Sequence, residues 1–199
     1  MANAGNAHEV ESRLRALKAH FLCMESDIAD EAAVKGIYAA AKERYGRVDI
    51  LVNNAADCDM DGLDSIVSLT RQVIDDTFAV NVRGSLLMMR EFVQQHGDYG
   101  RIINLSTDAA QFFPGQITYG ASKATLEVAA YGITVNCVAP GPTQTGWIDT
   151  ELEKAVIPLI FLRQLIQPED IADTVLFLAG ARAKMITGQV IKVSGGKAL

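Results

Sequence analysis

Val48-Asp49-Ile50-Leu51-Val52 is the stretch that decides the fold predicted for this sequence. This mostly apolar run does not alternate strictly with polar residues, and helical patterns lie on both sides of it. Such a run is typical of a strand covered on both faces, as in a parallel sheet between two layers of helices. It stops at Asn53-Asn54-Ala55-Ala56. We therefore expect an α/β protein built on a parallel sheet.

Further apolar runs predict the remaining strands. They are His20 to Met24, Arg101 to Thr107, Gly132 to Val138 and Ile186 to Val193. Helical spacing places helices between them, at Ala7 to Leu17, Asp30 to Gly46, Gln72 to Gln95, around Tyr119, and Pro168 to Gly180. The apolar segment from Trp147 to Leu165 is expected to be an irregular flap. The alternation predicts one domain over residues 1–199, a doubly wound (Rossmann-like) parallel sheet.

Composition excludes several classes of protein. The 199 residues are 49% hydrophobic and 21% charged, which suits one globular domain. A net charge of −6 argues against a nucleic-acid or anionic-membrane surface. Cys23, Cys58 and Cys137 are scattered, as expected for reduced thiols. Without an apolar run of membrane-spanning length or the pattern of a signal peptide, we expect a cytoplasmic protein.

The loop Asp57-Cys58-Asp59-Met60-Asp61-Gly62 matches the first half of a calcium-binding EF-hand loop. The match fails at the twelfth position, where Ser68 replaces the bidentate glutamate, and the flanks do not read as two helices. We expect a solvated acidic loop and no metal.

A candidate general acid/base pair lies in Tyr119-Gly120-Ala121-Ser122-Lys123. Four residues apart in a helix, the phenol and the ammonium share one face, so the lysine can favour the phenolate and lower its pKa. Asp27, Asn54, Ser106, Thr107 and the loop from Pro140 to Thr145 all follow predicted strands. Ligands of doubly wound sheets bind at that edge, so these residues define a candidate site.

Asn81 falls in the middle of a long helical pattern, near its apolar face. A buried carboxamide needs partners, so it either satisfies a neighbouring backbone group or holds a water for chemistry. The spacing favours the structural role.

Together these motifs resemble the classical short-chain dehydrogenase/reductase family, and most closely its 3-oxoacyl-(acyl-carrier-protein) reductase type. The matching pieces, in the family's order, are Asp27-Ile28-Ala29-Asp30, Asn53-Asn54-Ala55-Ala56, Asn81-Val82-Arg83-Gly84, Asn104-Leu105-Ser106-Thr107, Tyr119-Gly120-Ala121-Ser122-Lys123, Pro140-Gly141-Pro142-Thr143-Gln144-Thr145 and Ile186-Thr187-Gly188-Gln189.

The resemblance implies an oxidoreductase that transfers hydride between NAD(P)H and a carbonyl or secondary alcohol. Tyr119 would protonate the carbonyl oxygen, Lys123 would lower the pKa of Tyr119 and hold the nicotinamide ribose, and Asn81 would fix a water that replaces the proton. Asp27 and Ile28 would contact the adenine. The other implied cofactor contacts are Asn54, Ala55, Ala56, Tyr119, Lys123, Pro140, Gly141, Thr143 and Thr145.

A hydroxyl that orients the carbonyl completes the implied catalytic set, and two residues compete for it. Counting forward from the strand gives Thr107, whereas counting back from Tyr119 gives Ser106. If the loop between this strand and Tyr119 is one residue shorter than is common in the family, both counts give Thr107. Threonine offers the same hydroxyl as serine.

The sequence departs from the family in two places. The family's first strand, its glycine-rich turn and its second strand have no counterpart. From Lys123 to Gly132 there are also only nine residues, about 14 Å of helix against a strand of roughly 17–20 Å. We favour a natural chain with residues absent from this sequence; a truncated relative, or a partner chain that completes the sheet, would also fit.

The resemblance further implies a small carbonyl substrate such as a 3-oxoacyl thioester, NADP or NAD with NADP slightly favoured, and a homotetramer. Gln94 to Tyr99 has no basic residue to meet an acidic carrier protein, so carbonyl reduction is a firmer expectation than a carrier-bound substrate. The alternative function is a non-catalytic family member that serves as an assembly or regulatory subunit.

Overall fold

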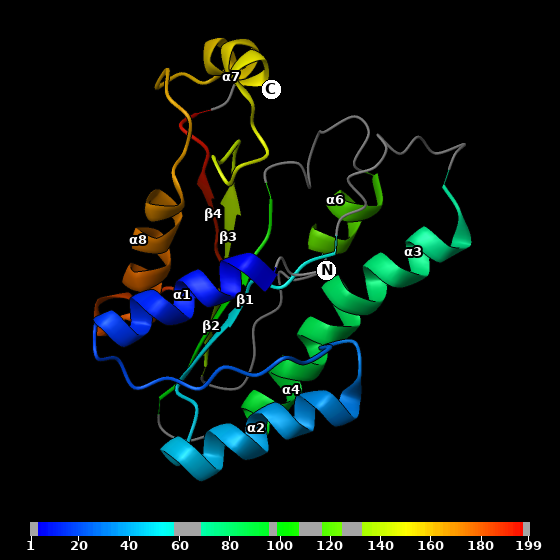
Figure 1. The fold of residues 1–199 in the computed structure, drawn as a ribbon, viewed down its shortest axis with the longest axis vertical. Coiled ribbons are helices and arrows are strands. Elements are labelled where there is room, and N and C mark those ends of the chain that lie inside the picture. The colour runs from blue at the N-terminus through cyan, green and yellow to red at the C-terminus, as the bar shows by residue number, and fades with distance from the viewer. Residues whose placement is uncertain (1–3, 58–68, 96–98, 108–116, 125–132, 197–199) are drawn as a thin grey trace.

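The described residues form a parallel four-stranded sheet with helices on both faces (Figure 1). The computed structural model describes residues 4–57, 69–95, 99–107, 117–124 and 133–196. The strands, which lie in the order β1-β2-β3-β4, are β1 (Ile50–Asn53), β2 (Arg101–Leu105), β3 (Thr134–Pro140) and β4 (Val190–Val193). Every neighbouring pair is parallel, which confirms the predicted fold class.

Helices connect and cover these strands. The α-helices are α1 (Ala4–Ala16), α2 (Glu31–Tyr45), α3 (Arg71–Phe78), α4 (Ser85–Gln94), α6 (Ile117–Ala124), α7 (Thr150–Val156) and α8 (Pro168–Ala179). A π-helix, η1 (Ala79–Gly84), joins α3 to α4, and 3-10 turns η2 (Ile157–Leu159) and η3 (Ala181–Ala183) follow α7 and α8. The long helix predicted from Gln72 to Gln95 is thus confirmed, with a π-helical turn at its centre.

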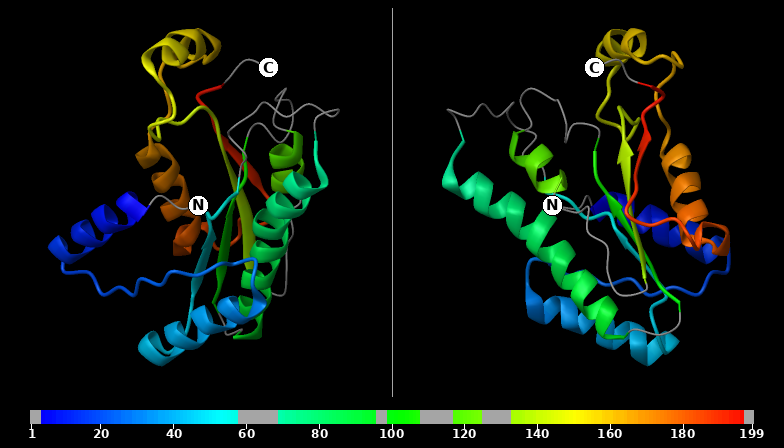
Figure 2. Two further views of the ribbon diagram at one scale, coloured as in Figure 1. Left: turned by 45° about the vertical axis from the view of Figure 1, so that its right-hand side comes forward. Right: turned by 180° about the vertical axis from the view of Figure 1, so that it is seen from behind.

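Two apolar clusters fill the space between the sheet and its helices. Leu51, Ile102 and Val135 face α2 and α4, where they meet Val34, Tyr38, Met89 and Phe92. Ile103, Leu105 and Val138 point the other way and pack against Leu178 of α8. Figure 2 shows α3 and α4 on one side of the sheet and α8 on the other. Successive strand residues therefore serve opposite faces, as period-two geometry requires.

Helix ends follow their capping residues. Asp30 caps α2 by accepting a hydrogen bond from the Ala32 amide, 2.9 Å away. Gly46 ends the same helix at φ +86°, a conformation that glycine adopts readily, and its amide bonds the carbonyl of Lys42. Pro168 begins α8, and Asp170 closes a capping box with Gln167. These predicted ends are confirmed.

The strand predicted at His20 to Met24 is wrong. Residues 19–27 have no regular structure, and Leu22 and Met24 are 43% and 45% exposed. This segment joins no ladder among the described residues, and an extended run that pairs with no other strand is not part of a sheet. Among the described residues, β1 pairs only with β2. Two of its side chains, Ile50 and Val52, are 42% and 41% exposed.

The segment after Trp147 is more ordered than the expected irregular flap. Asp149 caps α7 by accepting bonds from the amides of Glu151 and Leu152. Phe161 and Leu162 donate backbone hydrogen bonds to the carbonyls of Gly196 and Gly195, which ties this segment to the residues after β4. The acidic loop beyond Asp57 and the shortened stretch after Lys123 fall in residues 58–68 and 125–132, outside the described part.

Candidate active site

The carboxyl ends of the strands bring most of the predicted site residues to one edge of the sheet. Asn54 to Ala56 follow β1, Ser106 and Thr107 follow β2, and the loop from Gly141 to Thr145 follows β3. Because all strands are parallel, these segments share an edge. Helix α7 lies beyond the same ends of β3 and β4 (Figure 1).

Helix α6 carries Tyr119 and Lys123 to this edge. The Lys123 side chain is buried, and its ammonium nitrogen donates a hydrogen bond to the carbonyl oxygen of Leu105 at 2.8 Å. That nitrogen also lies 5.7 Å from the centroid of the Tyr119 ring. Tyr119 is half-buried. The structure therefore places the phenol and the ammonium on one face of the helix, next to the end of β2.

The two candidate hydroxyls at the end of β2 have different surroundings. Ser106 is buried, and its hydroxyl donates a long hydrogen bond of 3.4 Å to the backbone carbonyl of Lys123. Its amide bonds Val138 in the neighbouring strand. Thr107, one residue further from the sheet, is half-buried. Ser106 is thus drawn into the contact between β2 and α6, whereas Thr107 lies at the open edge.

Asn81 lies fully buried in the π-helix. Its carbonyl oxygen accepts from the Asp57 amide at 2.7 Å, and its amide nitrogen donates to the Asp57 carbonyl at 2.8 Å and to the Ser122 hydroxyl at 3.0 Å. The side chain therefore satisfies the backbone amide and carbonyl of Asp57, which is the structural role that the spacing favoured. The wider turn of a π-helix is frequent at functional sites. No sequence signal predicted it.

The segment predicted to contact adenine lies against the same π-helix. Asp27 accepts a hydrogen bond from the Ala29 amide at 2.9 Å, which fixes a tight turn. Ile28 covers Gly84 so closely that a Cβ at position 84 would lie 2.8 Å from its Cγ1 atom. The absence of a side chain at Gly84 therefore lets the Asp27–Ile28 turn approach the helix.

The loop after β3 is held by main-chain bonds on two sides. The Gly141 amide donates to the Val193 carbonyl at the end of β4. Thr143 forms a bridge with Ile166, and its hydroxyl donates to the Gly141 carbonyl at 2.8 Å. Thr145 is exposed. The Pro140–Thr145 loop is thus joined to the chain that returns from α7.

Ser122 was not predicted as a site residue, although it lies inside the Tyr119–Lys123 motif. Its hydroxyl joins Asn81 to the backbone of α6. Nothing in the spacing pairs two residues 41 positions apart, so this contact could be found only in the folded chain.

Neither a metal cluster nor a membrane helix emerges from the described residues. No group of three or more His, Cys, Asp or Glu side chains lies close enough to hold an ion among residues 4–57, 69–95, 99–107, 117–124 and 133–196. Over the same ranges, every helix is too short or too polar to cross a bilayer.

The parallel sheet with helices on both faces is a fold of the Rossmann type, and comparison with known proteins gives its family. Residues 1–198 match the family described as "Enoyl-(Acyl carrier protein) reductase". The chain belongs to the short-chain dehydrogenase/reductase family, whose members are NAD(P)-dependent enzymes.

Relatives of known role share about a third of its residues. The chain is 37% identical over 190 residues to the (2S)-[(R)-hydroxy(phenyl)methyl]succinyl-CoA dehydrogenase subunit BbsD of Thauera aromatica, covering 87% of this chain and 73% of that protein. It is 35% identical over 211 residues to the 3-oxoacyl-[acyl-carrier-protein] reductase FabG of Staphylococcus aureus, covering 97% and 85%.

Solved structures agree with the fold. A short-chain dehydrogenase/reductase from Serratia marcescens superposes with a TM-score of 0.88 at 31% identity, covering 98% of this chain and 84% of that one. A Burkholderia cenocepacia short-chain dehydrogenase in complex with NADP gives 0.87 at 30% identity with the same coverage.

Proposed function

We propose that this protein reduces a ketone to a secondary alcohol with NADPH. The observation that carries the proposal is the placement of Tyr119 and Lys123 on one face of α6, beside the end of β2. A phenol next to a buried ammonium at the open edge of a doubly wound sheet suits proton transfer to a carbonyl oxygen.

Tyr119 acts as the general acid in this proposal, and its hydroxyl gives a proton to the carbonyl oxygen. Lys123 favours the resulting phenolate through its positive charge. Thr107 orients the carbonyl by donating a hydrogen bond. Its half-buried position at the edge supports this choice over Ser106, whose hydroxyl is directed at the backbone of α6.

In this proposal Asn81 stabilises the backbone around the site. Three hydrogen bonds to protein groups occupy its carboxamide and tie the loop after β1 to α6. The role implied by the resemblance, the binding of a water that replaces the proton of Tyr119, stays a prediction.

The donors at this edge fit a nicotinamide nucleotide, because an ammonium and hydroxyl groups match the hydroxyls of a ribose. The bound nucleotide would supply the hydride. Lys123 and Tyr119 would meet the nicotinamide side, and Asp27 and Ile28 the adenine. The remaining proposed contacts are Asn54, Ala55, Ala56, Pro140, Gly141, Thr143 and Thr145. NADP is preferred over NAD because the Burkholderia relative of similar fold was solved in complex with NADP.

The proposed substrate is a ketone of the 3-oxoacyl-thioester type. Two relatives are identical to this chain at more than a third of the aligned residues. By name, one is a (2S)-[(R)-hydroxy(phenyl)methyl]succinyl-CoA dehydrogenase subunit and the other a 3-oxoacyl-[acyl-carrier-protein] reductase. Near the same edge, Phe161 and Leu162 beyond α7 are 70% and 68% exposed, so the chain offers an apolar surface for an acyl group.

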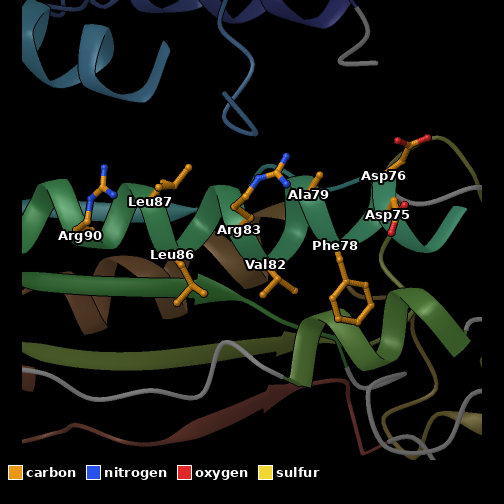
Figure 3. A pocket seen from close by; sticks show the side chains of 9 residues that line it. All are labelled: Asp75, Asp76, Phe78, Ala79, Val82, Arg83, Leu86, Leu87 and Arg90. Carbon is orange, nitrogen blue, oxygen red and sulfur yellow. The ribbon is translucent and has the colours of Figure 1, made fainter. Parts of the chain in front are cut away.

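A homotetramer, in the cytoplasm and with one domain per chain, completes the proposal. The outer face of α3, η1 and α4 supports the oligomer. A groove of about 800 Å³ lies there, and Phe78, Val82 and Leu86 project from one side of the helix (Figure 3). Its lining also includes Asp75, Asp76, Ala79, Arg83, Leu87 and Arg90. Leu86 is 45% exposed, as expected for a side chain buried between copies.

The test compares the wild-type protein with Tyr119→Phe, using NADPH fluorescence for binding and NADPH consumption with a 3-oxoacyl thioester for turnover. We expect the variant to lose turnover by at least about 100-fold while its affinity for NADPH changes little. Full activity of Tyr119→Phe would contradict the proposed acid. A protein that neither binds NADPH nor reduces a ketone would favour the non-catalytic alternative.

A further inference from the structure

Ser122 joins two parts of the site that are distant in sequence. The residue is fully buried in α6, between Tyr119 and Lys123. Its hydroxyl oxygen accepts a hydrogen bond from the Asn81 amide nitrogen at 3.0 Å and donates one to the backbone carbonyl of Tyr119 at 2.8 Å.

The direction of these bonds is fixed by the backbone of Asp57. An amide N–H can only donate, so the Asp57 amide requires the carbonyl oxygen of Asn81 on its side at 2.7 Å. The Asp57 carbonyl requires the Asn81 amide nitrogen in the same way. That nitrogen then faces Ser122, whose hydroxyl must accept. The single proton of the hydroxyl remains for the Tyr119 carbonyl.

A continuous line of hydrogen bonds therefore runs from the loop after β1, through the π-helix, into the first turn of α6. Lys123 fixes the next residue of that helix to β2 through the Leu105 carbonyl. Helix α6 is thus held on two sides, by Ser122 against the π-helix and by Lys123 against the sheet. Ser122 is fully buried, and its hydroxyl both accepts a hydrogen bond from Asn81 and donates one to the Tyr119 carbonyl.

We propose that Ser122 is a positioning residue, whose hydroxyl sets the first turn of α6, and with it Tyr119, relative to Asn81 and the loop after β1. This role rests on the proposed function of Tyr119 as the acid. Ser122 does not touch the substrate; it acts through the backbone of Tyr119. A displaced acid slows proton transfer, while nucleotide binding through the Lys123 side is preserved.

Ser122→Ala tests the role through a split between kcat and KM. We expect kcat to fall roughly 10- to 100-fold, because small displacements of a reacting group have effects of this size. The KM for NADPH should stay within about twofold of the wild-type value, since Lys123 keeps its bond to Leu105. A loss confined to KM, or a wild-type kcat, would overturn the role.

Ser85→Ala is the matched control. Ser85 is equally buried and lies at the start of α4, close in sequence to Asn81, but no hydrogen bond joins its side chain to α6 in the described part of the chain. We expect its kcat to stay within about twofold of wild type. An equal fall of kcat in both variants would show a general effect of removing buried hydroxyls. That result would contradict the positioning role of Ser122.

The double variant Asn81→Ala/Ser122→Ala isolates the hydrogen bond between the two side chains. If both act through one line of bonds, the loss in the double variant should equal that of the more severe single variant. Losses of kcat that multiply would overturn the inference. Ser122→Cys keeps the size and a weak donor, so its kcat should lie between those of wild type and Ser122→Ala, and it serves if the alanine variant does not fold.

The assay separates this inference from the proposed function. A wild-type protein that reduces no ketone, or an active Tyr119→Phe, overturns the acid and the role of Ser122 with it. An active wild type with an inactive Tyr119→Phe and a fully active Ser122→Ala overturns the role of Ser122 alone.

Discussion

The side-chain nitrogen of Lys123 lies 2.8 Å from the carbonyl oxygen of Leu105, the last residue of β2. This bond joins α6 to the sheet through a side chain that is only 2% exposed. Removal of an ammonium from water is unfavourable unless its protons are bonded, so a buried lysine is weak evidence for stability. The arrangement agrees with the catalytic role proposed for Lys123.

Lys123→Met should separate this catalytic role from a contribution to stability. Methionine fills the space of the aliphatic stem but has no charge, so we expect turnover to fall at least about 100-fold. The lost hydrogen bond and the relieved burial of charge act in opposite directions, so the free energy of unfolding should change by less than about 1.5 kcal/mol. Kinetics and urea denaturation of the same preparation measure both. A large destabilisation with retained turnover per folded molecule would contradict this account.

Asn53→Leu should destabilise the sheet. The two asparagines Asn53 and Asn104 are register partners on β1 and β2, and the amide nitrogen of Asn53 donates to the side-chain oxygen of Asn104 at 2.9 Å. Breaking this buried bond should cost about 1–3 kcal/mol in urea denaturation. Val52→Thr, on the exposed face of the same strand, should change stability by less than about 0.5 kcal/mol. Equal effects would show that the buried pair contributes nothing.

Gly84→Ala should weaken nucleotide binding. The added methyl would lie 2.8 Å from Ile28 Cγ1 and 3.0 Å from the Ile28 carbonyl, so the Asp27–Ile28 turn must move. We expect a stability loss of about 1–3 kcal/mol and a higher Kd for NADPH, measured by fluorescence titration. An unchanged Kd would argue against contact between this turn and the adenine.

Gly36→Ala is the control for that substitution. Gly36 lies within α2, and a Cβ there would meet no atom within 4 Å. Alanine should stabilise the helix by about 0.8–1 kcal/mol and leave the Kd for NADPH unchanged.

Glu31→Gln should remove a pH-dependent contribution to stability. Hydrogen bonds from Lys35 and then Arg90 lower the pKa of Glu31 below its ordinary value of 4.5. A lowered carboxyl pKa stabilises the fold above the unfolded value, and this stabilisation is lost as pH falls through the folded value. The wild type should therefore melt at a slightly higher temperature than the variant at about pH 7, and the difference should be smaller at an acidic pH well below 4.5.

Glu43→Gln is the matched control for Glu31. Glu43 is an exposed carboxylate on the same helix, and no ion pair joins it to any residue that the structure describes. Its melting difference from wild type should not change between the two pH values. A pH-dependent difference of the same size would show that net charge, and not the contacts of Glu31 with Lys35 and Arg90, is responsible.

The sheet and its helix ends could be predicted because local rules govern them. Apolar runs mark β2 and β3, which are buried along most of their length, and Asp30 and Gly46 bound α2 by side-chain capping and backbone freedom. The strand predicted at His20 to Met24 was wrong because an apolar run does not show whether the segment will pair with another strand. Periodicity cannot decide that.

The candidate site was predicted in part. Parallel topology was enough to place Thr107 and the Pro140–Thr145 loop at one edge, because the ends of parallel strands coincide. The π-helix and the bond from Asn81 to Ser122 depend on packing between residues distant in sequence. The periodicity of apolar residues along the sequence does not reveal such contacts.

The edge of β1 bears on how copies of the chain behave in concentrated solution. Its backbone bonds β2 on one side and no other strand of the described chain, and Ile50 and Val52 present exposed apolar side chains. Such an edge is a template on which another polypeptide can add a strand. Aggregation during expression should therefore begin at residues 50–53, and a lysine at position 52 would suppress it by placing a charge on the growing sheet.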